Sequence, residues 1–134
     1  MGFLGTRASS FSDMVLIAQT AGFLILFLGL IYVKKKNFLK HDKMAKISVL
    51  IGSLSFTWMG YSLVSNFLAL ISTNFMGLLI VSHAVIGLLA LFTGIFFVLD
   101  EIKKTKTAMI VTFISWAMAI FLGVCIYLTF SKNY

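Results

Sequence analysis

Two histidines, His83 and His41, are the side chains of this sequence best suited to bind haem or a metal ion. His83 lies inside a long apolar stretch, where an ionisable group is costly and often has a function. A neutral imidazole at this position can contact haem, a metal ion or a quinone, or it can hydrogen-bond Ser62 or Asn66 of a neighbouring helix. We expect the structural, hydrogen-bonded role for His83, with cofactor contact as the alternative.

Four aromatic residues could line a pocket for a flat ligand such as a quinone, namely Trp58, Tyr61, Trp116 and Tyr127. Such residues more often pack between helices or anchor a helix at the membrane surface, and Tyr127 suits the surface role. The single cysteine, Cys125, excludes an intramolecular disulfide and a thiolate metal cluster within one chain, so we expect it to serve packing.

The elements that position these residues must lie in a membrane. With 60% hydrophobic and 11% charged residues in 134, the chain has more apolar side chain than a soluble core of this size can bury. A membrane-spanning helix needs about 20 apolar residues. Four such helices with short loops use nearly the whole chain, which leaves no room for a soluble catalytic domain.

We therefore predict an all-α, polytopic membrane protein made of one domain, residues 1–134, with four transmembrane helices. The predicted spans are residues 14–33, 47–71, 76–99 and 108–130. The short connections at 72–75 and 100–107 force consecutive helices to run antiparallel, which predicts an up-and-down bundle. The sequence contains no proline, so we expect helices without the breaks found in many transporters.

Nine of the eleven basic residues lie in two segments between predicted spans. Cytoplasmic loops retain lysine during insertion, so both segments should face the cytoplasm and both termini should lie outside the cytoplasmic membrane. We expect these lysines to meet anionic lipid headgroups rather than nucleic acid. The lysines are Lys34, Lys35, Lys36, Lys40, Lys43, Lys46, Lys103, Lys104 and Lys106.

This topology places His41 in a cytoplasmic loop and His83 in the outer half of its span, about 20 Å or more apart along the membrane normal. Metal ligands lie only about 2 Å from the ion, so the two histidines are metal-ligand candidates separately and not as one site. The four acidic residues, Asp13, Asp42, Asp100 and Glu101, lie at or beyond the ends of the spans. This placement argues against a proton pump or an ion-coupled carrier.

Each predicted span also carries a seam of small or weakly polar residues at alternating steps of three and four. Lipid gives helices no hydrophobic reason to associate, so close approach at small residues, and hydrogen bonds between Ser, Thr, Asn and Gln, should hold the bundle together. We therefore predict that the seam faces inward. Its residues are Gly22, Gly29, Gly52, Ser55, Ser62, Asn66, Gly87, Ala90, Gly94, Ser115 and Ala119.

A His-x-x-Met pair, His41 and Met44, lies just before the second predicted span, and His83 lies near the start of the third. The last span carries a Trp, a Gly and a Tyr in that order, Trp116, Gly123 and Tyr127. This order resembles that of a prokaryotic family of small polytopic membrane proteins, catalogued as domain of unknown function 420. The likeness covers roughly residues 40–128.

The chain departs from that family's pattern in two places. It has Lys103, Lys104 and Lys106 where the family has a histidine before the last helix. It also has Ile114 where a proline precedes the Trp. Both departures weaken the metal site that the resemblance would otherwise imply.

Some members of the family are encoded near assembly factors for haem-copper oxidases, so the resemblance implies an association with membrane respiratory or copper enzymes. We therefore predict a non-catalytic accessory or assembly subunit of a larger membrane oxidoreductase, with other integral membrane subunits and lipids as partners and no cofactor of its own. The oxidoreductase would be a haem-copper terminal oxidase or a copper-dependent monooxygenase of the ammonia or methane type.

Two alternatives belong to other classes of protein. One is a small redox carrier that holds haem or quinone near His83, Trp116 and Tyr127. The other is an oligomeric small-molecule channel, for which the sequence offers neither a ring of charged residues nor a broken helix.

Overall fold

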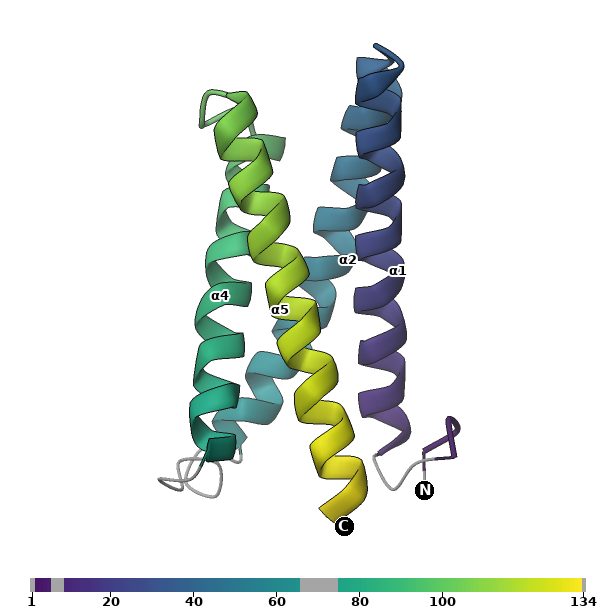
Figure 1. Cartoon of the computed structure of the whole chain (residues 1–134), viewed down its shortest axis with the longest axis vertical. Coiled ribbons are helices and arrows are strands. Elements are labelled where there is room, and N and C mark those ends of the chain that lie inside the picture. The colour runs from purple at the N-terminus through teal and green to yellow at the C-terminus, as the bar shows by residue number, and fades with distance from the viewer. Residues whose placement is uncertain (1, 6–8, 66–74, 134) are drawn as a thin grey trace.

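The fold is all-α. A computed structural model describes residues 2–5, 9–65 and 75–133, except for the side chains of residues 62, 63, 65 and 130–133. The described part contains four long helices, α1 (Ser10–Lys34), α2 (Phe38–Ser65), α4 (Phe75–Val98) and α5 (Lys106–Asn133). Consecutive helices run in opposite directions, and both chain termini lie at the same end of the molecule (Figure 1).

Three of these helices are long and apolar enough to cross a membrane, namely α1, α4 and the Lys106–Thr129 part of α5. The protein is therefore a helical membrane protein by the length and composition of these helices. Within its described residues α2 does not meet the same criteria. Its first turns carry Lys40, Asp42, Lys43 and Lys46, which lower its apolar content.

The predicted spans correspond closely to α1, α4 and α5, but α2 differs. This helix begins at Phe38, so the segment 40–46, expected to be part of a loop, forms its first turns. His41 is therefore a helical residue that faces α1. The predicted connection at 72–75 lies outside the described residues, apart from Phe75, which begins α4.

The helices form a ring in chain order. α1 packs along α2 and α4 packs along α5, and these two hairpins meet where α2 contacts α4 and where α1 contacts α5. Among the described residues, the diagonal pairs α1–α4 and α2–α5 make no backbone approach. This connectivity is that of an up-and-down four-helix arrangement.

The two hairpin turns are built in the same way, although they share no sequence. After α1, Lys36 adopts a left-handed conformation with φ 56°, and after α4, Asp100 does so with φ 58°. In the first turn the N–H of Asn37 donates to Tyr32 O, and in the second the N–H of Glu101 donates to Phe96 O. In both turns, therefore, an N–H donates to the carbonyl five residues earlier. This hydrogen bond satisfies a carbonyl that the end of the helix would otherwise leave without a partner.

Side chains cap the helices that follow these turns. The Asn37 side chain accepts a hydrogen bond from the N–H of Lys40, at the start of α2. The Thr105 hydroxyl accepts one from the N–H of Ala108, at the start of α5. Both are ordinary N-terminal caps, which a polar side chain just before a helix provides.

Trp116 of α5 occupies the centre of the bundle, where it is buried against Val49 of α2 and Ala90 of α4. Two glycines make room for its ring. A Cβ on Gly52 would lie 2.8 Å from Trp116 Cζ2, and one on Gly94 would lie 3.6 Å from its Cζ3. Trp116 of the α4–α5 hairpin thus packs directly on the backbone of α2, because residue 52 is a glycine.

Most of the predicted seam faces inward, as expected. Gly87 and Ser115 are half-buried, whereas Asn66 and the Ser62 side chain lie outside the described part. The buried members are Gly22, Gly29, Gly52, Ser55, Ala90, Gly94 and Ala119.

The expected hydrogen bonds between Ser and Thr of different helices are mostly not found among the described side chains. The hydroxyls of Ser48 and Ser55 donate to carbonyls four residues earlier in their own helix. Thr112 donates to a carbonyl of α5 and also lies 3.3 Å from the Thr93 hydroxyl of α4. A carbonyl in the same helix is the nearest acceptor, so it satisfies a hydroxyl without a second helix.

The packing of Trp116 predicts that Gly52→Ala destabilises the protein. The added methyl group would overlap the buried indole ring, and overpacking of this kind costs about 1–3 kcal/mol. Gly60→Ala is the matched control, because a Cβ at Gly60 meets nothing within 4 Å. Thermal unfolding of the two variants in detergent measures the difference. Equal stability of both variants would contradict this account of the core.

Candidate functional site

His83 of α4 is held against the backbone of α5. Its Nδ1 lies 2.7 Å from the carbonyl oxygen of Ala119. A carbonyl oxygen can only accept, so Nδ1 carries the proton, and Nε2 of the neutral ring is left as an acceptor. The ring lies over Gly123, where a Cβ would be 3.1 Å from His83 Cε1. Glycine at 123 is therefore what allows the imidazole to reach the helix backbone.

His41 of α2 makes the same kind of contact with α1. Its Nδ1 lies 3.1 Å from the carbonyl oxygen of Gly29, and a Cβ on Gly29 would be 3.3 Å from that nitrogen. Met44, one turn along α2, packs on the same glycine, where a Cβ on Gly29 would lie 3.4 Å from the Cβ of Met44. The His-x-x-Met pair of the sequence is thus part of the α1–α2 contact.

The structural role expected for His83 agrees with this geometry, but its partner belongs to a different helix. We expected Ser62 or Asn66 of the second span, and the acceptor is a backbone carbonyl of α5. Asn66 and the Ser62 side chain lie outside the described part. The two histidines belong to different hairpins and contact different partners, so the structure does not bring them together.

A third contact between helices involves Asp13, a residue that sequence reasoning left at the edge of a span. Its carboxylate has no exposed surface and lies at the start of α1. The Tyr127 hydroxyl of α5 donates to Oδ1 at 2.5 Å, and the N–H of Leu4 donates to Oδ2 at 3.0 Å. The end of α5 is thereby tied to the start of α1 and to the chain that precedes it.

One signal in the sequence could have pointed to this pair. In an up-and-down bundle of four helices the start of the first helix and the end of the last lie at the same end. Asp13 and Tyr127 occupy those places, and a carboxylate beside a membrane needs a donor. Tyr127, expected at the membrane surface or in a ligand pocket, is instead that donor.

The aromatic residues considered for a ligand pocket do not converge. Trp116 packs on Ala90 and Gly94, which lie 7 and 11 residues beyond His83, or about 10 and 16 Å along α4. Trp58 stacks on Phe11 at 3.8 Å between ring centroids, and Tyr61 lies beside Trp58 on the exposed surface of α2. Within the described residues, these rings form a core residue and a surface cluster rather than the walls of one site.

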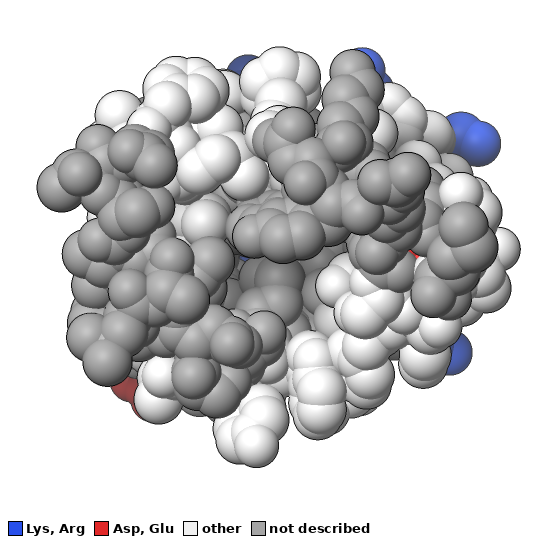
Figure 2. Space-filling view, turned by 90° about the horizontal axis from the view of Figure 1, so that it is seen from below, with Lys and Arg blue, Asp and Glu red and all other residues white. Residues whose placement is uncertain are grey.

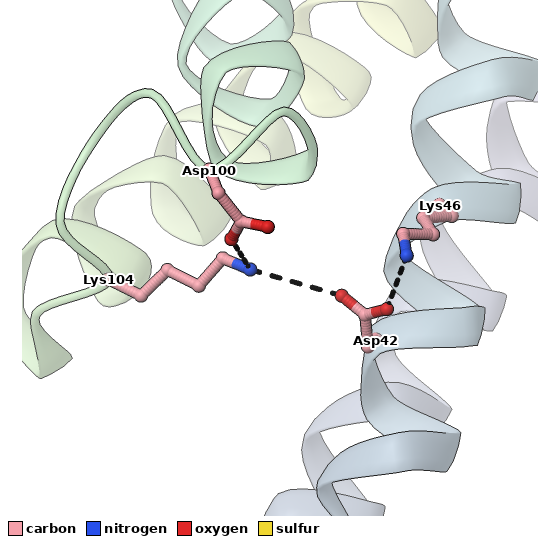
Figure 3. Close-up of polar contacts among 4 residues, drawn as sticks. All are labelled: Asp42, Lys46, Asp100 and Lys104. Carbon is pink, nitrogen blue, oxygen red and sulfur yellow. Dashed lines mark ion pairs between the residues drawn. The ribbon is translucent and has the colours of Figure 1, made fainter.

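The lysines of the two lysine-rich segments lie at the end opposite the chain termini (Figure 1), where an ion pair between Asp42 and Lys104 joins the hairpins. Asp42 of α2 lies 2.6 Å from Lys46 Nζ and 3.9 Å from Lys104 Nζ, and Lys104 also pairs with Asp100 at 2.5 Å (Figure 3). The hydrogen bond from Lys46 is the main cause that lowers the pKa of the Asp42 carboxyl, and the same bond raises the pKa of Lys46. All four side chains are well exposed, so salt screens these pairs.

The opposite end differs sharply in charge. Seen from the side that carries both termini, the described surface is mostly uncharged, with a few lysine atoms mainly near the rim and a few acidic atoms (Figure 2). Among the residues that the structure describes, the lysines of both lysine-rich segments thus lie at the end opposite the termini (Figure 1).

Among the described residues, no three side chains of His, Cys, Asp or Glu come close enough together to hold a metal ion. Cys125 is half-buried and is not in a disulfide. No protein-family model, no curated protein and no solved structure matches this chain.

The Asp13–Tyr127 contact predicts that Tyr127→Phe lowers stability by about 1–3 kcal/mol, because a buried carboxylate loses a donor. Tyr61→Phe is the matched control, since Tyr61 is 68% exposed and should change stability by less than about 0.5 kcal/mol. Thermal unfolding in detergent compares the two. If Tyr127→Phe is as stable as Tyr61→Phe, the contact does not help to close the bundle.

Proposed function

We propose that this protein is a non-catalytic accessory or assembly subunit of a larger membrane oxidoreductase. The observation that carries the proposal is that the side chains best suited to chemistry are used in contacts between helices. His41 and His83 bond to backbone carbonyls, Trp116 fills the core and Tyr127 bonds to Asp13. The interior thus resembles the packed core of a scaffold more than a site with free reactive groups.

The outside of the bundle supports the same proposal. Only 11%, 6% and 11% of the most apolar windows of α1, α4 and α5 are buried inside the protein. Most residues of these windows therefore keep part of their surface available to lipid or to other transmembrane helices. Large exposed side chains such as Leu89, Phe92 and Phe121 project from this surface, where they can pack against other helices by van der Waals contact.

The proposal includes a topology. We take α2 as a fourth span from about Ile47 onward, since the charged residues of this helix all lie in its first turns. Both lysine-rich turns would then face the cytoplasm and both termini the outside of a prokaryotic cytoplasmic membrane. Figure 1 supports this choice, because both turns lie at the end opposite the termini.

The class of partner enzyme rests on the resemblance to the domain of unknown function 420 family. That resemblance favours a haem-copper terminal oxidase, with a copper-dependent monooxygenase of the ammonia or methane type as the other member of the class. His41 and Met44, which match the family's His-x-x-Met pair, pack together on Gly29. In this chain the pair supports helix packing, which suits a subunit without a metal of its own.

Purification of the tagged chain from its native membrane in mild detergent tests the proposal. We expect a larger enzyme with haem or copper to co-isolate, and we expect that enzyme to assemble less well when the chain is deleted. A second tagged membrane protein from the same cells is the control for non-specific capture. A chain that migrates alone in native gels, with normal oxidase and monooxygenase levels in the deletion strain, would refute the proposal.

A second candidate, a small redox carrier with haem at His83, is favoured by one observation. Donation from Nδ1 to a backbone carbonyl leaves Nε2 with a free lone pair, and this arrangement orients many ligating histidines. Trp116 does not belong to that site, because its ring packs at Gly94 and Gly52. The candidate therefore rests on His83, with Tyr127 one turn beyond Gly123 on α5.

Absorption spectra and quinone extraction of the purified protein separate the two candidates. The carrier requires a Soret band or a bound quinone that is lost in His83→Ala and kept in His41→Ala, whose imidazole makes the same type of bond in the other hairpin. The accessory subunit requires a colourless, ligand-free chain in both variants and in the wild type.

A further inference from the structure

The turn between α1 and α2 carries a concentration of lysines that the protein itself does not neutralise. From residue 34 to residue 46 there are six lysines and one aspartate, a formal charge of +5. Asp42 is paired with Lys46 and approached by Lys104. Among the described residues the other five form no ion pair, and Lys34, Lys35, Lys36, Lys40 and Lys43 are all exposed.

The turn between α4 and α5 lies at the same end but is nearly neutral. Residues 99–106 contain three lysines, Asp100 and Glu101, a formal charge of +1. Lys104 of this turn forms an ion pair with Asp100 and a longer one with Asp42 of the other hairpin (Figure 3). The attraction for anions at this end is therefore concentrated on the α1–α2 turn.

Apolar side chains are interleaved with the free lysines of that turn. Phe38 is 64% exposed and Leu39 is 88% exposed, and both lie between Lys36 and Lys40. Lys36 is the left-handed residue of the turn, so the chain reverses within this cluster. A mixture of exposed aromatic or aliphatic groups with lysines suits the boundary between acyl chains and headgroups, where both kinds of group find partners.

The position of the cluster along the chain agrees with this. α1 is a candidate span that ends at Lys34, so Lys34, Lys35 and Lys36 directly follow its apolar residues. Lys40, on the first turn of α2, holds its ammonium group 5.3 Å from the ring centroid of Tyr32 in the last turns of α1. The aromatic ring thus keeps one of the charges beside the span rather than extended into water.

We propose that the α1–α2 turn is a binding surface for the phosphate headgroups of anionic phospholipids, with Lys35 and Lys36 as its central charges and Phe38 and Leu39 inserted among the lipid chains. Nucleic acid or a soluble acidic protein would leave Phe38 and Leu39 in water, whereas a lipid satisfies both the lysines and these side chains. The inference is independent of which larger complex the protein joins.

The test uses the full-length protein in phosphatidylcholine vesicles that contain a trace of spin-labelled phosphatidylglycerol or spin-labelled phosphatidylcholine. The immobilised fraction of each label gives the relative association of the two lipids with the protein. We expect the wild type to prefer phosphatidylglycerol, and to lose most of this preference in high salt, which screens charges beyond a few ångströms.

Two variants with equal changes in charge decide where the preference arises. Lys35→Gln/Lys36→Gln should reduce it by up to about fivefold for each lysine removed. Lys103→Gln/Lys106→Gln, the matched control, should leave it within about twofold of the wild type, because these residues belong to the nearly neutral turn. Lys35→Arg/Lys36→Arg should keep the preference.

Equal losses in the two glutamine variants, or a wild type without any preference for phosphatidylglycerol, would overturn the proposal. Circular dichroism checks that each variant is helical. If the double variants do not fold, Lys36→Gln and Lys106→Gln take their place with the same expectations. If lipid preference is unchanged in Lys35→Gln/Lys36→Gln while a co-isolated protein is lost, the surface binds a protein instead and the lipid assignment is wrong.

Discussion

Hydrocarbon supplies neither hydrogen bonds to polar groups nor a hydrophobic force that drives apolar helices together, and the contacts of this protein follow from that constraint. Two helices associate there when their backbones approach closely enough for dispersion and for hydrogen bonds that water does not weaken. In this chain the approach occurs at glycines. His41 reaches the carbonyl of Gly29, and His83 lies over Gly123 and reaches the carbonyl of Ala119. Each hairpin is thus held by an imidazole on a bare stretch of helix.

The hairpins are joined to one another at three heights, by three different interactions. The buried carboxylate of Asp13 and the hydroxyl of Tyr127 connect α1 and α5 at the end with the termini. Trp116 fills the centre. At the basic end the link is the ion pair between Asp42 and Lys104, which is exposed and open to screening by salt. The joint between hairpins is therefore firmest in the centre and at the terminal end, and weakest between the lysine-rich turns.

This construction bears on function because the same side chains cannot serve two purposes equally well. A histidine that donates to a helix carbonyl and sits on a glycine contributes to stability by about 0.6 kcal/mol in typical membrane cases, and up to about 1.7 kcal/mol. Its second nitrogen remains chemically available, which is why His83 is the residue on which a cofactor role depends. Many large apolar side chains of the described residues are exposed on the outside of the bundle, which suits a protein whose partners are other membrane helices and lipids.

Much of the architecture follows from local properties of the chain. The apolar stretches and the two lysine-rich segments determined the approximate helices, the antiparallel order and the basic end, because hydrophobicity and charge act residue by residue. The small residues Gly52 of α2 and Ala90 and Gly94 of α4 were correctly placed inside. In each helix, their spacing from the other small residues puts them on one face. The turns were not foreseen in detail, since Lys36 and Asp100 adopt a left-handed conformation that glycine usually supplies.

What only the tertiary structure decided is which groups meet. Helical spacing specifies a face but not the rotation and height of the opposing helix, so it could not show that His83 would bond to α5 rather than to α2. For the same reason the sequence could not show that Asp13 would contact Tyr127, which lies 114 residues further along the chain. The sequence determined that this protein has long apolar helices with a basic end. The packing of one helix on another determined that its histidines and Tyr127 hold those helices together.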